Sequence, residues 1–182
     1  NAAFFLRRSG HQQLQLDELL ARIDVTEIHH DDRGPTVWGT WAPIGVEVHA
    51  SLHQLDEHWL LQIGISLNTF FREFVGDDGG DLPLANDPGL PLALAFRDAC
   101  LQLGAEVAFF TTNPSRGTDE FALGQEPLVR AGRIDELPYQ GYALLFLDEK
   151  LQYQAPYLQA RDEIEFDQGR LIFAGRGSAR WF

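Results

Sequence analysis

The histidines are the residues whose types and spacing come nearest to a reaction centre. All six lie in the first third of the sequence. Two are adjacent in "EIHHDD" (residues 27–32), and two flank the acidic pair of "HQLDEH" (residues 53–58). Zinc takes three or four nitrogen, sulfur or oxygen ligands, so convergence of these two segments would support a metal-dependent hydrolase. The residues of this alternative are His29, His30, His53 and His58.

The spacing of these residues argues against a metal centre. Adjacent residues of a strand point to opposite faces, so His29 and His30 are poor co-ligands. The sequence contains neither HExxH nor a paired-cysteine spacing. The segment "DDRGP" that follows is typical of a turn. We therefore expect no metal and no cofactor, and we interpret "EIHHDD" as a hairpin tip that forms a contact surface.

Other reactive residue types lack the patterns that their chemistry requires. "GDDGGD" (residues 76–81) does not have the ligand spacing of a calcium-binding loop, so its aspartates are interpreted as turn formers. No GxSxG or phosphate-binding loop is present. The single cysteine, Cys100, lies among apolar helical residues and is expected to be buried. The sequence therefore predicts no catalytic residue.

The charge of the chain narrows the classes of partner. The net charge is -13, from 27 acidic and 14 basic side chains. A nucleic-acid or anionic-membrane partner would require a basic footprint, so both are disfavoured. No apolar run approaches the roughly 20 residues of a membrane span. An acidic surface instead suits a protein partner with a basic surface, because complementary charge accelerates their encounter.

Hydrophobic periodicity predicts an α+β fold. Apolar residues at helical spacing predict an N-terminal helix over residues 14–23, and Pro91 and Gly104 delimit a central helix. Asn68 is expected to cap a short helix that follows the early strands. Alternation predicts an antiparallel β-meander with one buried face in residues 24–67 and later strands in 105–112 and 141–149. A hairpin that turns at residues 167–169 is expected at the C-terminus.

These elements predict one domain with a mostly antiparallel sheet. We assign it to residues 4–182, set aside residues 1–3, and place a possible internal boundary in the Gly- and Pro-rich loop of residues 76–91. "NPSRGTDE" (residues 113–120) is expected to be a loop. Trp38 and Trp41 have opposite strand parity, which predicts that one of them is exposed. An exposed aromatic residue beside acidic residues is typical of a binding hot spot.

In its size, acidity and lack of catalytic motifs, the chain resembles small acidic bacterial binding proteins, such as immunity proteins that neutralise a toxin. The hypothesis is a cytoplasmic, non-catalytic protein that covers a basic surface of its partner. The alternatives are the metal-dependent hydrolase and a structural or oligomeric domain that pairs through a strand edge near "RLIFAG" (residues 170–175); the oligomeric state stays open. The expected partner-binding residues are Asp31, Asp32, Trp38, Asp56, Glu57, Asp77, Asp78 and Asp81.

Overall fold

The structure is a computed structural model in which part of the chain is described. The described residues are 1–9, 13–32, 34–75, 88–111, 118–131, 133, 144–148, 151, 163–166 and 169–173. The boundary expected within residues 76–91 falls mostly outside these ranges, because residues 76–87 are not described.

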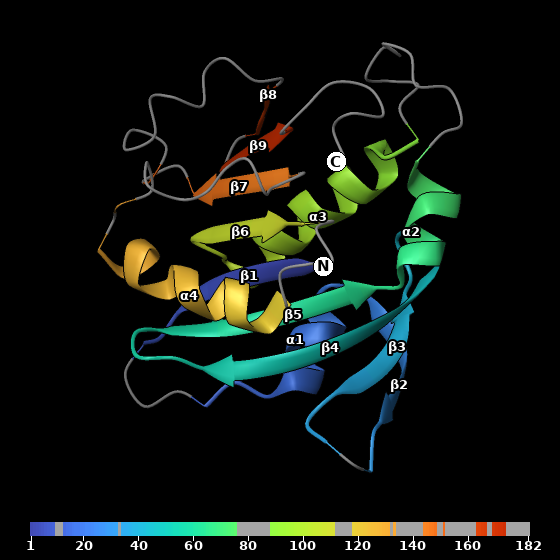
Figure 1. The fold of residues 1–182 in the computed structure, drawn as a ribbon, viewed down its shortest axis with the longest axis horizontal. Coiled ribbons are helices and arrows are strands. Elements are labelled where there is room, and N and C mark those ends of the chain that lie inside the picture. Colours follow the sequence, from blue (N-terminus) through green and yellow to red (C-terminus); the bar gives the residue numbers. More distant parts are fainter. Residues whose placement is uncertain are drawn as a thin grey trace.

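An antiparallel sheet forms the centre of the fold (Figure 1). In the described part of the chain it has nine strands in the order β2-β3-β4-β5-β1-β6-β7-β9-β8. Every neighbouring pair is antiparallel, so the prediction of an α+β fold with a mostly antiparallel sheet is confirmed. The strands are β1 (Ala2–Arg7), β2 (Val25–His30), β3 (Val37–Trp41), β4 (Val46–Gln54), β5 (His58–Ile65), β6 (Val107–Phe110), β7 (Leu144–Asp148), β8 (Glu163–Phe166) and β9 (Gly169–Phe173).

The early meander is confirmed, with one difference at β5. Strands β2, β3, β4 and β5 pair in sequence order, as alternation predicts. Along β4, Val46, Val48 and Ala50 are buried while Glu47 is exposed. Strand β5 is buried at every residue, so the expectation of one buried face is wrong for this strand. The reason is that packed residues cover both faces of the sheet there.

Sequence patterns did not predict the first strand, and they did not predict the helix over Thr118–Arg130 either. β1 lies between β5 and β6, in the interior of the sheet. Its residues Ala2 to Leu6 are all buried, which agrees with an uninterrupted apolar run that is covered on both faces. Setting aside residues 1–3 was therefore wrong for Ala2 and Ala3, which are 1% and 3% exposed.

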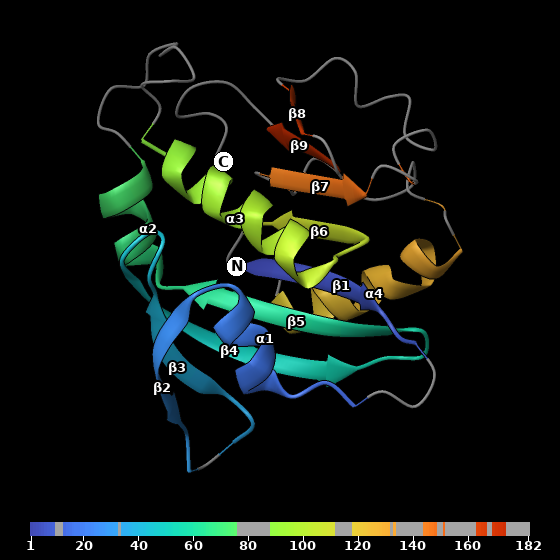
Figure 2. The same ribbon diagram turned by 180° about the vertical axis from the view of Figure 1, so that it is seen from behind.

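Helices cover the two faces of the sheet unequally. Helices α1 (Leu16–Arg22), α2 (Leu67–Phe74) and α3 (Leu90–Leu103) contribute to the larger core, together with alternate residues of the strands. Helix α4 (Thr118–Arg130) packs on the other face, where Val129 joins Phe5, Leu60 and Phe109. Figure 1 shows α4 in front of the sheet, and Figure 2 shows α1 and α3 in front of its opposite face.

The ends of the helices follow local sequence signals in part. Helix α3 has Pro91 in its first turn and ends at Gly104, whose φ of 66° is left-handed, as predicted. The cap of α2 is Ser66 and not Asn68, because the helix begins at Leu67 and the Ser66 hydroxyl accepts the Thr69 N–H. Residues 118–120 belong to α4, so the loop expected over residues 113–120 is wrong at its C-terminal end.

The C-terminal hairpin is confirmed, whereas the expected free edge is wrong. Strands β8 and β9 pair with Phe166 opposite Gly169, as the predicted turn requires. The segment "RLIFAG" contributes to β9, which lies between β7 and β8. Both sides of β9 are therefore paired, and in the described part of the sheet the outer strands are β2 and β8.

Candidate functional site

One face of the meander forms a surface of aromatic, histidine and acidic side chains. The face that α4 covers near β5 and β1 continues over β2, β3 and β4, where α4 does not extend (Figure 1). Strand register places alternate residues of these three strands on this face. We call the part of this surface around Trp38 the open face; it is formed by the exposed or half-buried residues Glu27, His29, Trp38, Thr40, Glu47 and His49.

Trp38 is the large apolar side chain of the open face. It is 44% exposed, whereas Trp41 is 1% exposed and donates its indole N–H to the carbonyl oxygen of Ile23 at 3.0 Å. The prediction from strand parity is thus confirmed. The Trp38 ring lies 5.3 Å from the His49 ring, centroid to centroid, and Trp38 pairs in register with His29 on its other side. Aromatic and imidazole rings therefore form a row across three strands.

A glycine on the neighbouring strand accommodates the His49 ring. Gly64 of β5 is the register partner of His49. A Cβ atom added to Gly64 would lie 2.0 Å from Cε1 and 2.1 Å from Nε2 of His49. The imidazole therefore occupies the space that a side chain at residue 64 would fill. Gly64 is in this way a positioning residue for His49, and through it for Trp38.

Two carboxylates lie on the open face beside Trp38. Glu27 has a left-handed φ of 54° within an irregularity between Thr26 and His29. Bulges of this kind redirect side chains, and the Glu27 carboxylate accepts the Thr40 hydroxyl hydrogen at 3.1 Å. Glu47 is the register partner of Thr40 on the other side and is exposed. Negative charge thus lies on both sides of the strand that carries Trp38.

The predicted acidic residues occupy separate parts of the molecule. Asp31 and Asp32 are exposed at the β2–β3 turn, beyond His30. Asp56 and Glu57 are exposed at the β4–β5 turn, and Figure 1 shows the two turns at different corners of the molecule. Asp56 is also neutralised in part, because its Oδ2 accepts a hydrogen bond from Arg130 at 2.6 Å. The remaining predicted residues lie outside the described residues: Asp77, Asp78 and Asp81.

The histidines of the metal alternative have different partners. His30 Nε2 lies 3.1 Å from the Asp17 carboxylate in an exposed pair. His53 Nε2 lies 3.1 Å from the Ser51 hydroxyl. His58 is buried, and His29 is on the open face. Among the described residues, no group of three or more His, Cys, Asp or Glu side chains could hold a metal ion.

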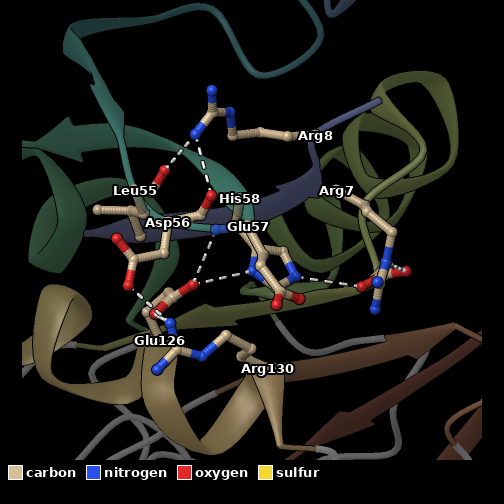
Figure 3. A network of polar contacts seen from close by, with 9 residues as sticks. Arg7, Arg8, Leu55, Asp56, Glu57, His58, Glu126 and Arg130 are labelled. Atoms are coloured by element: carbon tan, nitrogen blue, oxygen red, sulfur yellow. Dashed lines mark hydrogen bonds and ion pairs between the residues drawn. The ribbon is translucent and has the colours of Figure 1, made fainter. Parts of the chain in front are cut away.

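His58 lies at the centre of a second polar cluster, which Figure 3 shows, and its side chain is buried. Its side chain is 0% exposed, with Nδ1 at 3.3 Å from Glu126 Oε1 and Nε2 at 3.2 Å from Glu106 Oε2. A neutral imidazole has one donor and one acceptor, whereas a protonated imidazole donates from both nitrogens. Carboxylate oxygens lie within hydrogen-bond distance of both nitrogens, so the ring donates to at least one of them.

Arginines complete the cluster from outside. The Arg7 Nε–H donates to Glu106 at 2.6 Å, and Arg130 donates to Asp56 while lying 4.0 Å from Glu126. The hydrogen bond from His58, assisted by Arg7, lowers the pKa of Glu106 from 4.5 to about 2. Hydrogen bonds to carboxylates likewise raise the pKa of Arg7 and that of Arg130. We call Arg7, Asp56, His58, Glu106, Glu126 and Arg130 the His58 network.

The backbone of the β4–β5 turn is attached to the same cluster. The Glu57 N–H donates to Glu126 at 3.4 Å. Arg8 donates to the carbonyl oxygens of Leu55 at 2.8 Å and Asp56 at 2.9 Å, and its guanidinium carbon lies 5.8 Å from the centre of the Trp59 ring. The network therefore connects α4 to β1, β5 and this turn, so its evident role is to hold α4 against the sheet.

No sequence motif indicated these partners of His58. Glu106 and Glu126 are 48 and 68 residues from His58 and belong to no motif. Cys100 is buried as expected, and burial raises the pKa of its thiol, which disfavours the reactive thiolate. His58, Glu106 and Glu126 are thus engaged in structural contacts, and Cys100 is buried.

No protein-family model, curated protein or solved structure matches this chain. Within the described residues, no helix has the length and apolar character needed to cross a membrane.

Proposed function

We propose that the protein is a non-catalytic interaction protein that binds a basic surface of a protein partner through the open face. The observation that carries the proposal is the exposed Trp38, set among carboxylates on a sheet face that α4 leaves free. Tryptophan is enriched among the residues that dominate binding energy at protein interfaces. An acidic protein of this kind would act as an immunity-type inhibitor when its partner is a toxin with a cationic active site.

The charge of the meander supports a basic partner. Residues 24–66, which include β2 to β5, contain seven acidic residues and one basic residue, Arg33. This segment therefore carries a larger share of the net negative charge than of the residues of the chain. Carboxylates around an interface accelerate association with a cationic surface and repel acidic proteins. The charge thus favours rapid association and selection of a basic partner.

The test is binding to the product of the neighbouring gene, which is the natural candidate if the protein is an immunity-type inhibitor. The dissociation constant is measured by calorimetry at about 0.01 M and about 1 M ionic strength, where the Debye length is roughly 30 Å and roughly 3 Å. We expect a complex that weakens strongly at high salt. No complex, or a complex that is indifferent to salt, contradicts the proposal.

Matched variants locate the surface. Trp38→Ala should raise the dissociation constant at least about tenfold, as loss of a hot-spot residue does. Phe71→Ala is the control, because Phe71 is similarly exposed at 39% but lies on α2. Light scattering of the free protein addresses the oligomeric alternative. A dimer that Trp38→Ala converts to a monomer would assign the open face to self-association instead.

A further inference from the structure

We infer that the open face binds an arginine side chain of the partner, with the guanidinium on Trp38 and its charge compensated by Glu27 and Glu47. This inference rests on the proposed function and specifies the chemistry that the partner presents. It requires an accessible aromatic ring, carboxylates within reach of that ring, and a reason to prefer arginine over lysine.

The aromatic requirement is met by Trp38. Its ring is supported by His49 at a centroid distance of 5.3 Å, and 44% of the residue is exposed. Tryptophan is the aromatic residue to which cations bind best. The His49 ring can pack against Trp38 from this side because Gly64 has no side chain in the space that the ring occupies. The His49 ring therefore packs against the indole and leaves part of it accessible.

The carboxylate requirement is met by Glu27 and Glu47. Both lie next to Thr40, which is two residues from Trp38 on the same face of β3. Directly opposed residues on neighbouring strands lie about 5 Å apart and diagonal ones about 7–8 Å apart, within reach of long side chains. A cation on Trp38 is therefore within reach of two carboxylates that come from different strands.

The geometry favours arginine over lysine. A guanidinium is planar, stacks on aromatic rings and has five N–H donors, so it can contact the indole and two carboxylates together. An ammonium is compact and more strongly hydrated, and it acts as a point charge. Charge alone would attract both cations equally. An arginine preference that is lost when Trp38 is replaced therefore reports the aromatic contact, which the general acidity of the chain cannot supply.

The experiment uses the full chain with hexa-arginine and hexa-lysine amides as probes, measured by calorimetry at low salt. We expect hexa-arginine to bind more tightly, on the order of tenfold. Trp38→Leu should remove this preference, and Trp38→Phe should retain part of it. The double variant Glu27→Gln/Glu47→Gln should weaken binding of both peptides. The controls are Phe71→Leu and Glu18→Gln, which change an exposed aromatic ring and an exposed carboxylate elsewhere.

The outcomes separate this inference from the proposed function. Equal binding of the two peptides, or an arginine preference that survives Trp38→Leu, overturns the arginine site while leaving a basic partner possible. Failure of both peptides to bind overturns the acidic binding surface and the inference with it. Because Trp38, Glu27 and Glu47 are exposed, their variants are expected to fold, and circular dichroism with the unfolding midpoint verifies this.

Discussion

Removal of the buried imidazole is the sharpest test of how α4 is attached to the sheet. In His58→Leu, Glu126 would lose the donor at 3.3 Å while remaining buried, with a side chain that is 8% exposed. Glu106 would be less affected, because it is 26% exposed and retains Arg7 at 2.6 Å. Breaking a buried ion pair from one side costs about 3–5 kcal/mol. Since Arg130 remains 4.0 Å from Glu126, we expect the lower part of that range, about 3 kcal/mol.

Urea unfolding at neutral pH, followed by circular dichroism, measures this free energy. A loss of about 3 kcal/mol should lower the thermal midpoint by about 6–12 °C in a domain of this size. His30→Leu is the matched control, because the His30–Asp17 pair is 65% and 54% exposed. Exposed pairs contribute about 0–1 kcal/mol, so this variant should remain close to the parent protein.

A second variant shows whether the unpaired charge is the cause. Replacing both partners of a buried pair by apolar residues is often neutral. His58→Leu/Glu126→Leu should therefore recover most of the stability that His58→Leu loses. If His58→Leu is as stable as His30→Leu, or if the double variant is no more stable than the single one, the proposed role of the network is refuted.

Three further predictions concern the same fold. The pKa of Glu106 is lowered from 4.5 to about 2 in the folded protein. The stability that the Glu106 carboxylate contributes is therefore present above pH 4.5 and is lost as the pH falls towards 2. In Glu106→Gln, the free energy of unfolding should depend less on pH across that interval. Gly104→Ala should destabilise the protein by about 1 kcal/mol in urea unfolding, because Gly104 ends α3 with a φ of 66°. Ser66→Ala should cost about 1 kcal/mol, since the Ser66 hydroxyl caps α2, whereas Asn68→Ala should cost less.

Local sequence patterns were sufficient for the elements whose signals lie within a few residues. Alternation along "GVEVHASL" predicted the buried and exposed sides of β4, and parity separated the exposed Trp38 from the buried Trp41. Pro91 and Gly104 predicted the extent of α3. The physical cause is local in each case. Side chains alternate along a strand, and proline and glycine have backbone preferences that suit the ends of a helix, so the sequence alone is sufficient.

Tertiary structure decided the features whose partners are distant in the chain. In the sequence β1 is only a short apolar run. Its position between β5 and β6 depends on pairing with residues far along the chain, since Ala2 lies opposite both Ile63 and Phe110. Helix α4 contains Pro127, which obscures a helical pattern, and its attachment through Glu126 and His58 spans 68 residues. The sequence thus determined the acidity, the antiparallel meander and the exposure of one tryptophan. Only the tertiary structure determined that α4 covers one part of the sheet face and leaves the part with Trp38 open, because strand order and long-range ion pairs are set by the packing of the whole core.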